Sequence, residues 1–284
     1  MIFLYKSNNN IISLITEYLI NNNFKTYIIE DINQLDNIKE VEQDSIFIYF
    51  YDKYLDVNIN LENTVEKIIT ICKLKKIKFI YIDSVDLFGL TEKTSVIEDD
   101  NHIPFSKIGK TKSILYKKLF DNKIDFCILR IPDILGKECN YFFNDIFNNS
   151  SNFIKWTGLT NINHEYIFDF ETIDVFGNIL KSLKSKTLVS KEYNFSGHKY
   201  TIEQIAATID ELTGINIKIN KISKFSLFLK SKKSPLAKVL YETCYLYEKP
   251  VFLNSKRYEK EFINIDDVKQ LDIYLNFVKA LHLN

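Results

Sequence analysis

The chain has 284 residues, enough for one large domain or for a large and a small one with an ample core. Its 37 basic and 37 acidic residues cancel, so nothing in the overall charge points to nucleic acid or an anionic membrane. No apolar run approaches the ~20 residues of a membrane span, and the N-terminus lacks a basic region and a cleavage site, so we expect a mature cytoplasmic protein.

The cysteines and histidines predict neither disulfides nor a metal site. Cys72, Cys127, Cys139 and Cys244 are widely spaced, and the first two fall on apolar faces. Such a pattern is typical of core thiols in a reducing compartment. The four histidines are also scattered, without the spacing that metal ligands need.

The N-terminal segment has the order and size of a dinucleotide-binding βαβ unit. Residues 2–5 are a short apolar run that predicts a strand, and residues 6–10 are a polar turn. Residues 11–20 carry apolar side chains at helical spacing. Residues 26–30 predict a second strand, which closes at Glu30.

A third strand is predicted over residues 45–50, and a helix over residues 60–73. The strand is nearly continuous in apolar residues, as buried strands of parallel sheets are. It ends at two large rings, Phe50 and Tyr51. One face of the helix is apolar and carries Leu61, Val65, Ile68, Ile69 and Cys72.

The densest pattern follows this helix. An apolar run over residues 78–83 ends at Ser84, and an acidic loop lies at 98–100. A helical pattern that contains Lys112 comes next, and residues 126–130 form a second apolar run. Strand, loop, helix and strand make another βαβ unit, so the fold class is α/β, with a doubly wound parallel sheet.

This pattern resembles the extended short-chain dehydrogenase/reductase family, the NAD(P)-dependent nucleotide-sugar epimerases, dehydratases and reductases. Within that family it is most similar to the dTDP-4-dehydrorhamnose reductase branch, in which an acidic loop leads to a proline and Tyr-Gly-x-Ser-Lys opens the catalytic helix. Here Ser84 takes the serine position, Lys112 the lysine position and Ile108 the tyrosine position. The resemblance covers nearly the whole chain.

The resemblance implies catalytic roles that this chain fills only in part. In the family, the tyrosine exchanges a proton with the sugar oxygen while hydride moves to or from the nicotinamide. The lysine lowers the pKa of that tyrosine and binds the ribose, and the serine orients the substrate oxygen. Ile108 can do none of the tyrosine's work. Without that partner, Lys112 is interpreted as a solvated or ion-paired lysine, and Ser84 equally well as a turn residue.

Other tyrosines are candidates for a displaced proton donor, and Tyr81 and Tyr116 are the nearest. The spacing Tyr-x-x-x-Lys also occurs at Tyr49–Lys53 and Tyr245–Lys249, but neither pair lies on the helix that follows Ser84. Since the chain has 17 tyrosines and 35 lysines, chance accounts for such spacings.

The cofactor positions depart from the family too. Without a gap, the three glycines of G-x-x-G-x-x-G fall on Lys6, Asn9 and Ile12, while Glu30 stands where the ribose-binding acid would be. Those glycines allow a tight turn and a close backbone approach to the pyrophosphate. The two small residues that usually leave room beside the cofactor are replaced by the rings at 50 and 51. We therefore expect NAD(P) to bind weakly or not at all.

The resemblance also implies a smaller, discontinuous lobe for the substrate. The expected Rossmann-like domain is residues 1–136, with about 166–185 and a C-terminal helix near 265–281 added to its core, and the expected lobe is residues 137–165 and 186–264. Within the lobe, Thr201 and Gln204 have the spacing of a capping box, with Gly214 past the helix end. The segment 222–250 is rich in lysine and aromatic residues, and its local structure is left open.

We interpret the chain as a degenerate, non-redox family member that binds a nucleotide sugar or a partner protein in surface-polysaccharide biosynthesis. The alternative is an active NAD(P)-dependent nucleotide-sugar 4-ketoreductase or epimerase with an unusual cofactor loop. A second alternative is a regulatory subunit, because the same branch includes a reductase-like protein that regulates methionine adenosyltransferase. A homodimer and a complex with a partner enzyme both stay open.

Overall fold

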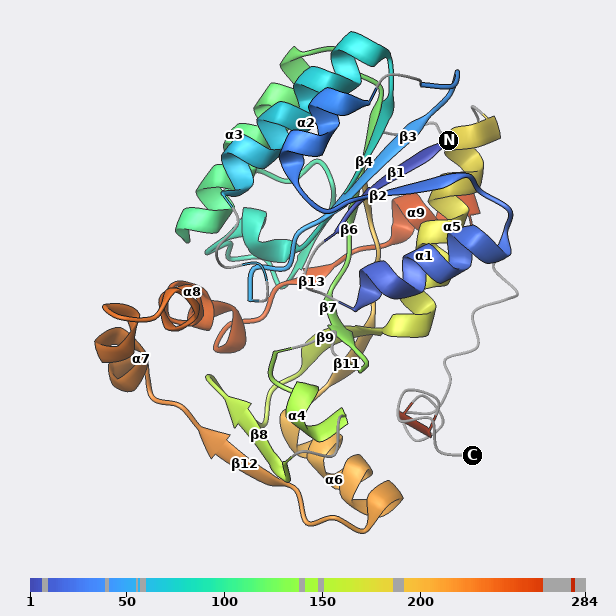
Figure 1. The fold of residues 1–284 in the computed structure, drawn as a ribbon. Helices are drawn as coiled ribbons and strands as arrows, with labels where there is room; N and C mark the ends of the chain where they lie inside the picture. Colours follow the sequence, from blue (N-terminus) through green and yellow to red (C-terminus); the bar gives the residue numbers. More distant parts are fainter. Residues whose placement is uncertain are drawn as a thin grey trace.

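A six-stranded parallel sheet forms the centre of the computed structural model (Figure 1). The structure describes residues 1–6, 10–38, 41–54, 56, 60–137, 141–147, 151–185, 192–262 and 277–278. The order of the strands across the sheet is β10-β6-β4-β3-β1-β2. The strands are β1 (Ile2–Tyr5), β2 (Thr26–Ile29), β3 (Ile46–Phe50), β4 (Lys78–Asp83), β6 (Phe126–Arg130) and β10 (Glu192–Asn194). The doubly wound parallel sheet is confirmed, and each predicted strand lies within one residue of its expected bounds.

The strand order reverses beside β1. From β1 the chain passes through α1 (Ile11–Asn21) to β2 on one side, then through η1 (Ile32–Asn37) to β3 on the other. Ligands of open α/β sheets bind outside the carboxyl ends of the strands at such a switch point. The carboxyl edge of β1, β3, β4 and β6 is therefore where a site is expected.

The two faces of the sheet differ in chemistry, because alternate residues of a strand point to opposite faces. The face toward α2 (Leu61–Lys75) and α3 (Lys107–Asp121) is aromatic and carries Phe3, Tyr5, Phe47, Tyr49, Phe79, Tyr81 and Phe126. The face toward α1 and α5 (Asp169–Ser185) is mainly aliphatic and carries Ile2, Leu4, Ile46, Ile48, Ile80, Ile82 and Leu129. Figure 1 shows the two pairs of helices on opposite sides of the sheet.

Caps set the ends of the helices beside the carboxyl edge. The Asn60 side chain accepts a hydrogen bond from the Asn63 N–H at the start of α2, and Lys76 ends that helix in the left-handed conformation. The Ser106 hydroxyl accepts from the Gly109 N–H and so begins α3. This start gives Lys112 its place on the second turn of α3, facing the end of β4.

A second hydrophobic cluster lies beyond the carboxyl edge and is built around Trp156, Phe143 and Tyr247. Its sheets are β7 (Asp133–Leu135) with β9 (His164–Phe168) and β11 (His198–Tyr200), and β8 (Phe153–Trp156) with β12 (Lys218–Lys221). Its helices are α4 (Asn144–Phe147), α6 (Ile202–Thr213), α7 (Lys224–Ser231) and α8 (Pro235–Thr243). The remaining elements are η2 (Val85–Phe88), β5 (Ser95–Val96), η3 (Cys244–Tyr247), β13 (Phe252–Leu253) and α9 (Lys256–Phe262).

Local details confirm some expectations. The capping box of Thr201 with Gln204 is present, and Gly214 ends α6 in the left-handed conformation. α5 begins at Asp169, where the Glu171 carboxylate accepts a hydrogen bond from the Phe168 N–H and caps the first turn. β12 begins at Lys218, just after Ile217, whose N–H donates to the Asp210 carboxylate.

Three statements concern only the described residues. No helix among them is long and apolar enough to cross a membrane. They hold no group of three or more side chains placed to bind a metal, and their three cysteines, at 72, 127 and 244, are buried free thiols. The expected C-terminal helix and Cys139 lie outside the described residues except at 277–278. The proposed division into two domains stays a prediction.

Candidate functional site

The structure brings Ser84 and Lys112 together at the end of β4. The Lys112 ammonium donates to Ser84 Oγ at 2.8 Å and to Asp86 Oδ2 at 3.1 Å. It also forms an ion pair with Asp83, with 2.6 Å between Nζ and Oδ1. The three close polar neighbours of this ammonium therefore all belong to the protein itself. Lys112 is only 1% exposed. The ion-paired interpretation of this lysine therefore holds, and the solvated one is wrong.

Buried carboxylates keep Lys112 charged. Burial alone would lower its pKa, but the nearby carboxylates of Asp83 and Asp86 outweigh burial, and the pKa is raised. The Ser84 hydroxyl donates its proton to Asp86 Oδ2 at 2.5 Å. Both side chains that would hold a substrate oxygen or a ribose are thus committed to partners within the protein.

A second lysine, Lys53, completes this buried network from the other side. Its ammonium lies 2.9 Å from Asp86 Oδ1, and its side chain is 6% exposed. Burial would raise the pKa of Asp86, but the charges of Lys53 and Lys112 prevail and hold it far below its usual range. The two lysines and the two aspartates at 83 and 86 sum to zero charge. A buried, neutral and mutually paired set is stable only while every member is present.

The residue after Lys53 ties the sheet to the second cluster. The Tyr54 hydroxyl lies 2.6 Å from the Tyr247 hydroxyl and 3.3 Å from Thr243 Oγ1. Tyr247 in turn donates to Asp133 Oδ2 at 3.0 Å. Residues 51–54, which we call the bridging segment, therefore run from the end of β3 past the ends of β4 and β6. Their side chains take up space at the carboxyl edge of the sheet.

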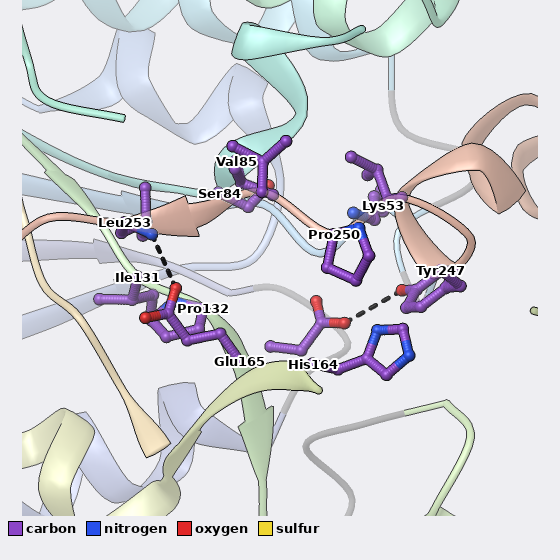
Figure 2. A pocket seen from close by; sticks show the side chains of 13 residues that line it. Lys53, Ser84, Val85, Ile131, Pro132, His164, Glu165, Tyr247, Pro250 and Leu253 are labelled. Atoms are coloured by element: carbon purple, nitrogen blue, oxygen red, sulfur yellow. Dashed lines mark hydrogen bonds between the residues drawn. The ribbon is translucent and has the colours of Figure 1, made fainter. Parts of the chain in front are cut away.

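Two small cavities remain at this edge, each with a volume of about 40 Å³. One adjoins the bridging segment, Ser84 and the start of β7. The other is lined by Lys53, Ser84, Tyr247, His164 and Glu165, which Figure 2 shows around a common space. Cavities that hold small molecules typically measure about 300–1,000 Å³. Each of these has room for a few water molecules, and neither has room for a nicotinamide ribose or a sugar.

The tyrosine position opens onto a different space. Ile108 is half-buried and lines a groove of about 380 Å³ between α3, the start of α2, and α8. Tyr51, Lys107 and Lys238 also line this groove. The groove has the volume of a small-molecule site. Ser84 does not line it, so Ser84 and Ile108 do not face one common cavity.

Of the cofactor positions near β1, the structure describes Lys6, Ile12 and Glu30. Lys6 and Glu30 pair with each other, with 2.8 Å between Nζ and Oε1, and this hydrogen bond, together with the charge of Lys6, lowers the pKa of Glu30. Ile12 is 4% exposed and packs in the aliphatic core, as an apolar residue of α1 should. Asn9 lies outside the described residues. Among the described residues, Glu30 is thus paired with Lys6, and the carboxyl edge of the sheet is occupied by Lys53 and Tyr54.

The candidates for a displaced proton donor are also engaged elsewhere. Tyr116 donates to Asp83 Oδ2 at 2.5 Å, and burial raises its pKa well above the usual value. Tyr81 is fully buried in the aromatic face, and burial raises its pKa strongly as well. Neither side chain lines either cavity at the carboxyl edge. A raised pKa in a buried site is opposite to what a proton donor at neutral pH requires.

Sequence reasoning missed the residues that fill the site, namely Lys53, Tyr54, Asp86, Asp133 and Tyr247. A signal for part of them exists: Asp83 and Asp86 follow one strand and Lys53 follows its neighbour, and the carboxyl ends of parallel strands meet at one edge. That rule alone predicts a charged pair at this place. No local sequence pattern indicates Tyr247, which is 193 residues from its partner Tyr54.

No known family model matches the sequence, and no curated protein is significantly similar to it in sequence. Solved structures do match the fold over 99% of the chain. MoeE5 in complex with UDP-glucose and NAD has a TM-score of 0.74 at 11% identity, with 97% of its chain covered. UDP-glucuronic acid 4-epimerase from Bacillus cereus, in complex with UDP-glucuronic acid and NAD, has a TM-score of 0.74 at 15% identity, with 98% covered.

L-threonine dehydrogenase from Phytophthora infestans matches equally well, with a TM-score of 0.73, 12% identity and 97% of its chain covered. The fold is therefore that of NAD-dependent sugar-nucleotide epimerases and related dehydrogenases. At such identities the likeness establishes the fold alone, and one fold hosts different chemistries. What this chain does has to be argued from its own residues.

Proposed function

We propose that this protein is a non-redox relative of the NAD-dependent epimerases and dehydratases, one that works by binding and not by hydride transfer. The observation that supports this best is the filled carboxyl edge. Lys53 and Tyr54 occupy it and are held by Asp86 and Tyr247. A dinucleotide would have to displace a buried ion pair and a buried hydrogen-bonded tyrosine, which costs several kcal/mol.

The expected ligand is a nucleotide sugar or a partner protein, in surface-polysaccharide biosynthesis. The nucleotide sugar is suggested by the ligands in the matched structures, UDP-glucose and UDP-glucuronic acid. The Ile108 groove has enough volume for it. Lys107 and Lys238 in its wall, beside Glu62 and Glu242, could pair with a diphosphate. The proposed ligand would then lie beside α3, away from Ser84.

Calorimetric titration tests the proposal directly. NAD⁺, NADH, NADP⁺ and NADPH should each give no saturable heat at millimolar concentration. UDP-glucose and UDP-glucuronic acid should bind, and Lys107→Glu should weaken that binding, whereas the exposed Lys117→Glu on the same helix should not. A micromolar dissociation constant for any dinucleotide would overturn the non-redox assignment.

An active 4-ketoreductase or epimerase is the second candidate. The observation that favours it is the contact between Ser84 and Lys112, which keeps two of the three catalytic positions adjacent. It requires the bridging segment to leave the carboxyl edge when a cofactor binds. Turnover of a 4-keto sugar nucleotide with NADPH, measured as the loss of NADPH absorbance, would establish it. A regulatory subunit would instead reveal itself by stoichiometric co-purification with an enzyme.

A further inference from the structure

The hairpin of α7 and α8 carries a one-sided charge. Between Glu211 and Glu242 the chain has seven lysines and no acidic residue, and the lysines are Lys218, Lys221, Lys224, Lys230, Lys232, Lys233 and Lys238. The rest of the chain then holds 30 basic residues, seven fewer than the total of 37, against all 37 acidic ones. The molecule is neutral as a whole, but this segment is strongly positive and the remainder is negative.

The outer face of α7 is apolar as well. Phe225, Phe228 and Leu229 are 71%, 42% and 50% exposed. Their spacing of three and four residues places them on one side of the helix. Leu227 points the other way, is 2% exposed, and packs in the second cluster with Leu240. The helix is thus held by Leu227 and by the contact of the Phe228 ring with Tyr241 of α8, and it presents Phe225, Leu229 and part of Phe228 to solvent.

The lysines near this apolar face are exposed to solvent. Lys230, Lys232, Lys233 and Lys238 are exposed, and within the described part of the chain none of them has an ion-pair partner. Lys224 does pair, with Glu248 at 2.6 Å. The hairpin stands out from the sheet and its covering helices (Figure 1). Rings and aliphatic side chains on one face with lysines around them are the signature of a helix that lies in a membrane interface.

We propose that the α7–α8 hairpin docks this protein on an anionic lipid membrane surface. Phe225, Phe228 and Leu229 enter the headgroup region, and the lysines pair with lipid phosphates above them. The net negative charge of the remaining chain turns the rest of the molecule away from the surface, so one orientation is selected. The net charge of the whole chain is zero and gave no reason to expect a membrane, because the positive hairpin segment and the negative remainder cancel.

The size and charge of the patch favour lipid over a protein partner. A specific protein interface buries about 800 Å² on each side, with an apolar core inside a polar rim. The apolar face here consists of three side chains on a short protruding helix, and the charge around it is mainly positive, with Glu242 and Glu248 the acidic residues at its edge. An anionic bilayer meets both features with no need for shape complementarity, since each lysine near such a surface contributes independently.

Vesicle flotation tests the proposal with the full chain. The protein should float with vesicles of phosphatidylcholine containing about 30% phosphatidylglycerol, but not with pure phosphatidylcholine. Salt at about 0.5 M should release most of it, because screening weakens exposed charge pairs. Lys230→Glu/Lys232→Glu/Lys233→Glu should lower the partition coefficient more than about tenfold. The control Lys73→Glu/Lys117→Glu/Lys181→Glu makes the same change in net charge at exposed lysines of α2, α3 and α5, and should bind like wild type.

The apolar contribution has its own matched pair of variants. Phe225→Ser/Phe228→Ser should weaken binding about tenfold or more, whereas Leu74→Ser/Ile114→Ser, at positions 73% and 47% exposed on α2 and α3, should not. Insertion can also be seen directly, because the only tryptophan, Trp156, is fully buried. With Phe225→Trp, the added emission should shift to the blue on anionic vesicles and stay unchanged without them.

Three outcomes would overturn the proposal: equal binding to both kinds of vesicle, binding unaffected by the hairpin variants, or no binding at all. If vesicles fail and an acidic polypeptide such as polyglutamate binds in a hairpin-dependent manner, the surface is a protein-docking site instead. As a control for folding, circular dichroism spectra and thermal melting curves are recorded for each variant. The proposal does not depend on the ligand of the Ile108 groove, so either can fail without the other.

Discussion

At the scale of single residues, Lys112 is held entirely by partners within the protein. In this chain its ammonium contacts Ser84, Asp83 and Asp86, all within the protein. A lysine in this position that was free to bind a ribose would need at least one unengaged proton. Because it is buried and paired, Lys112 has a structural role, and its removal leaves the carboxylates of Asp83 and Asp86 without this counter-charge.

Lys112→Ala should therefore destabilise the fold. Removing one partner of a buried charge network typically costs about 3–5 kcal/mol, because the remaining charge is left uncompensated. Urea unfolding followed by circular dichroism measures this. Lys117→Ala, one exposed lysine further along α3, is the control and should change stability little. Equal stability of the two variants would mean that the buried network does not form in solution.

Ile108→Tyr should not create reductase activity. The side chain at 108 faces the groove beside α8, and the carboxyl edge of the sheet is occupied separately by Lys53 and Tyr54. The variant should fold, since the position is only half-buried, and should leave NADPH unconsumed with a 4-keto sugar nucleotide. Measurable turnover by this single variant would show that the bridging segment yields readily to the cofactor.

At the scale of elements, β9 begins with two ionisable side chains whose pKa values move in opposite directions. Burial lowers the pKa of His164 to about 4 from 6.5. Burial also raises the pKa of Glu165 to about 7 from 4.5, although hydrogen bonds from Leu253 N–H, Ser196 and Gly197 N–H favour the carboxylate. Both groups therefore prefer to be neutral in the folded protein.

These shifts predict opposing effects of pH on stability. As the pH falls from 6.5 toward 4, the unfolded state takes up a proton at His164 and the folded state resists, so stability is lost. As the pH rises from 4.5 toward 7, the unfolded state loses a proton at Glu165 before the folded state does, so stability is lost in that direction. In the wild type the two nearly cancel between pH 4.5 and 6.5.

Single substitutions should separate the two effects. Glu165→Gln should leave a protein that loses stability on acidification, and His164→Gln one that loses stability as the pH rises, each by at most about 3 kcal/mol across its range. Chemical unfolding at several pH values gives the slopes. Slopes of the same sign in both variants would rule out the opposed pKa shifts.

The elements themselves could largely be predicted from the sequence, and the site could not. Continuous apolar runs place the buried strands because a parallel sheet is covered on both faces. The capping box at Thr201 is equally local. In contrast, the contact between Tyr54 and Tyr247 joins distant segments, and only the packed structure shows that Lys53 fills the site. Periodicity states which face a side chain takes, but not which partner it meets.

At the scale of the whole molecule, stability should be concentrated in the central sheet. Every residue of β4 is buried between β3 and β6, whereas β12 is mostly exposed and pairs with β8 alone. Local opening is easiest where few apolar contacts and few strands hold the backbone. Hydrogen exchange should therefore show β12 amides exchanging first among the strands and β4 amides last. Comparable protection in β4 and β12 would contradict this gradient.

The zero net charge of the buried set formed by Lys53, Lys112, Asp83 and Asp86 also limits the mutational paths open to this protein. Replacing any one of the four by a neutral residue leaves one unpaired charge in the interior. Substitutions that cost little stability therefore replace a lysine and an aspartate together. Lys112→Met with Asp83→Asn removes one ion pair, leaves Lys53 with Asp86, and keeps an acceptor for the Tyr116 hydroxyl. The double variant should be more stable than the sum of its two single losses by about 1–3 kcal/mol, as a double-mutant cycle would measure. Drift away from this arrangement then requires two coordinated steps, and a lineage that takes only one of them passes through a poorly folded intermediate.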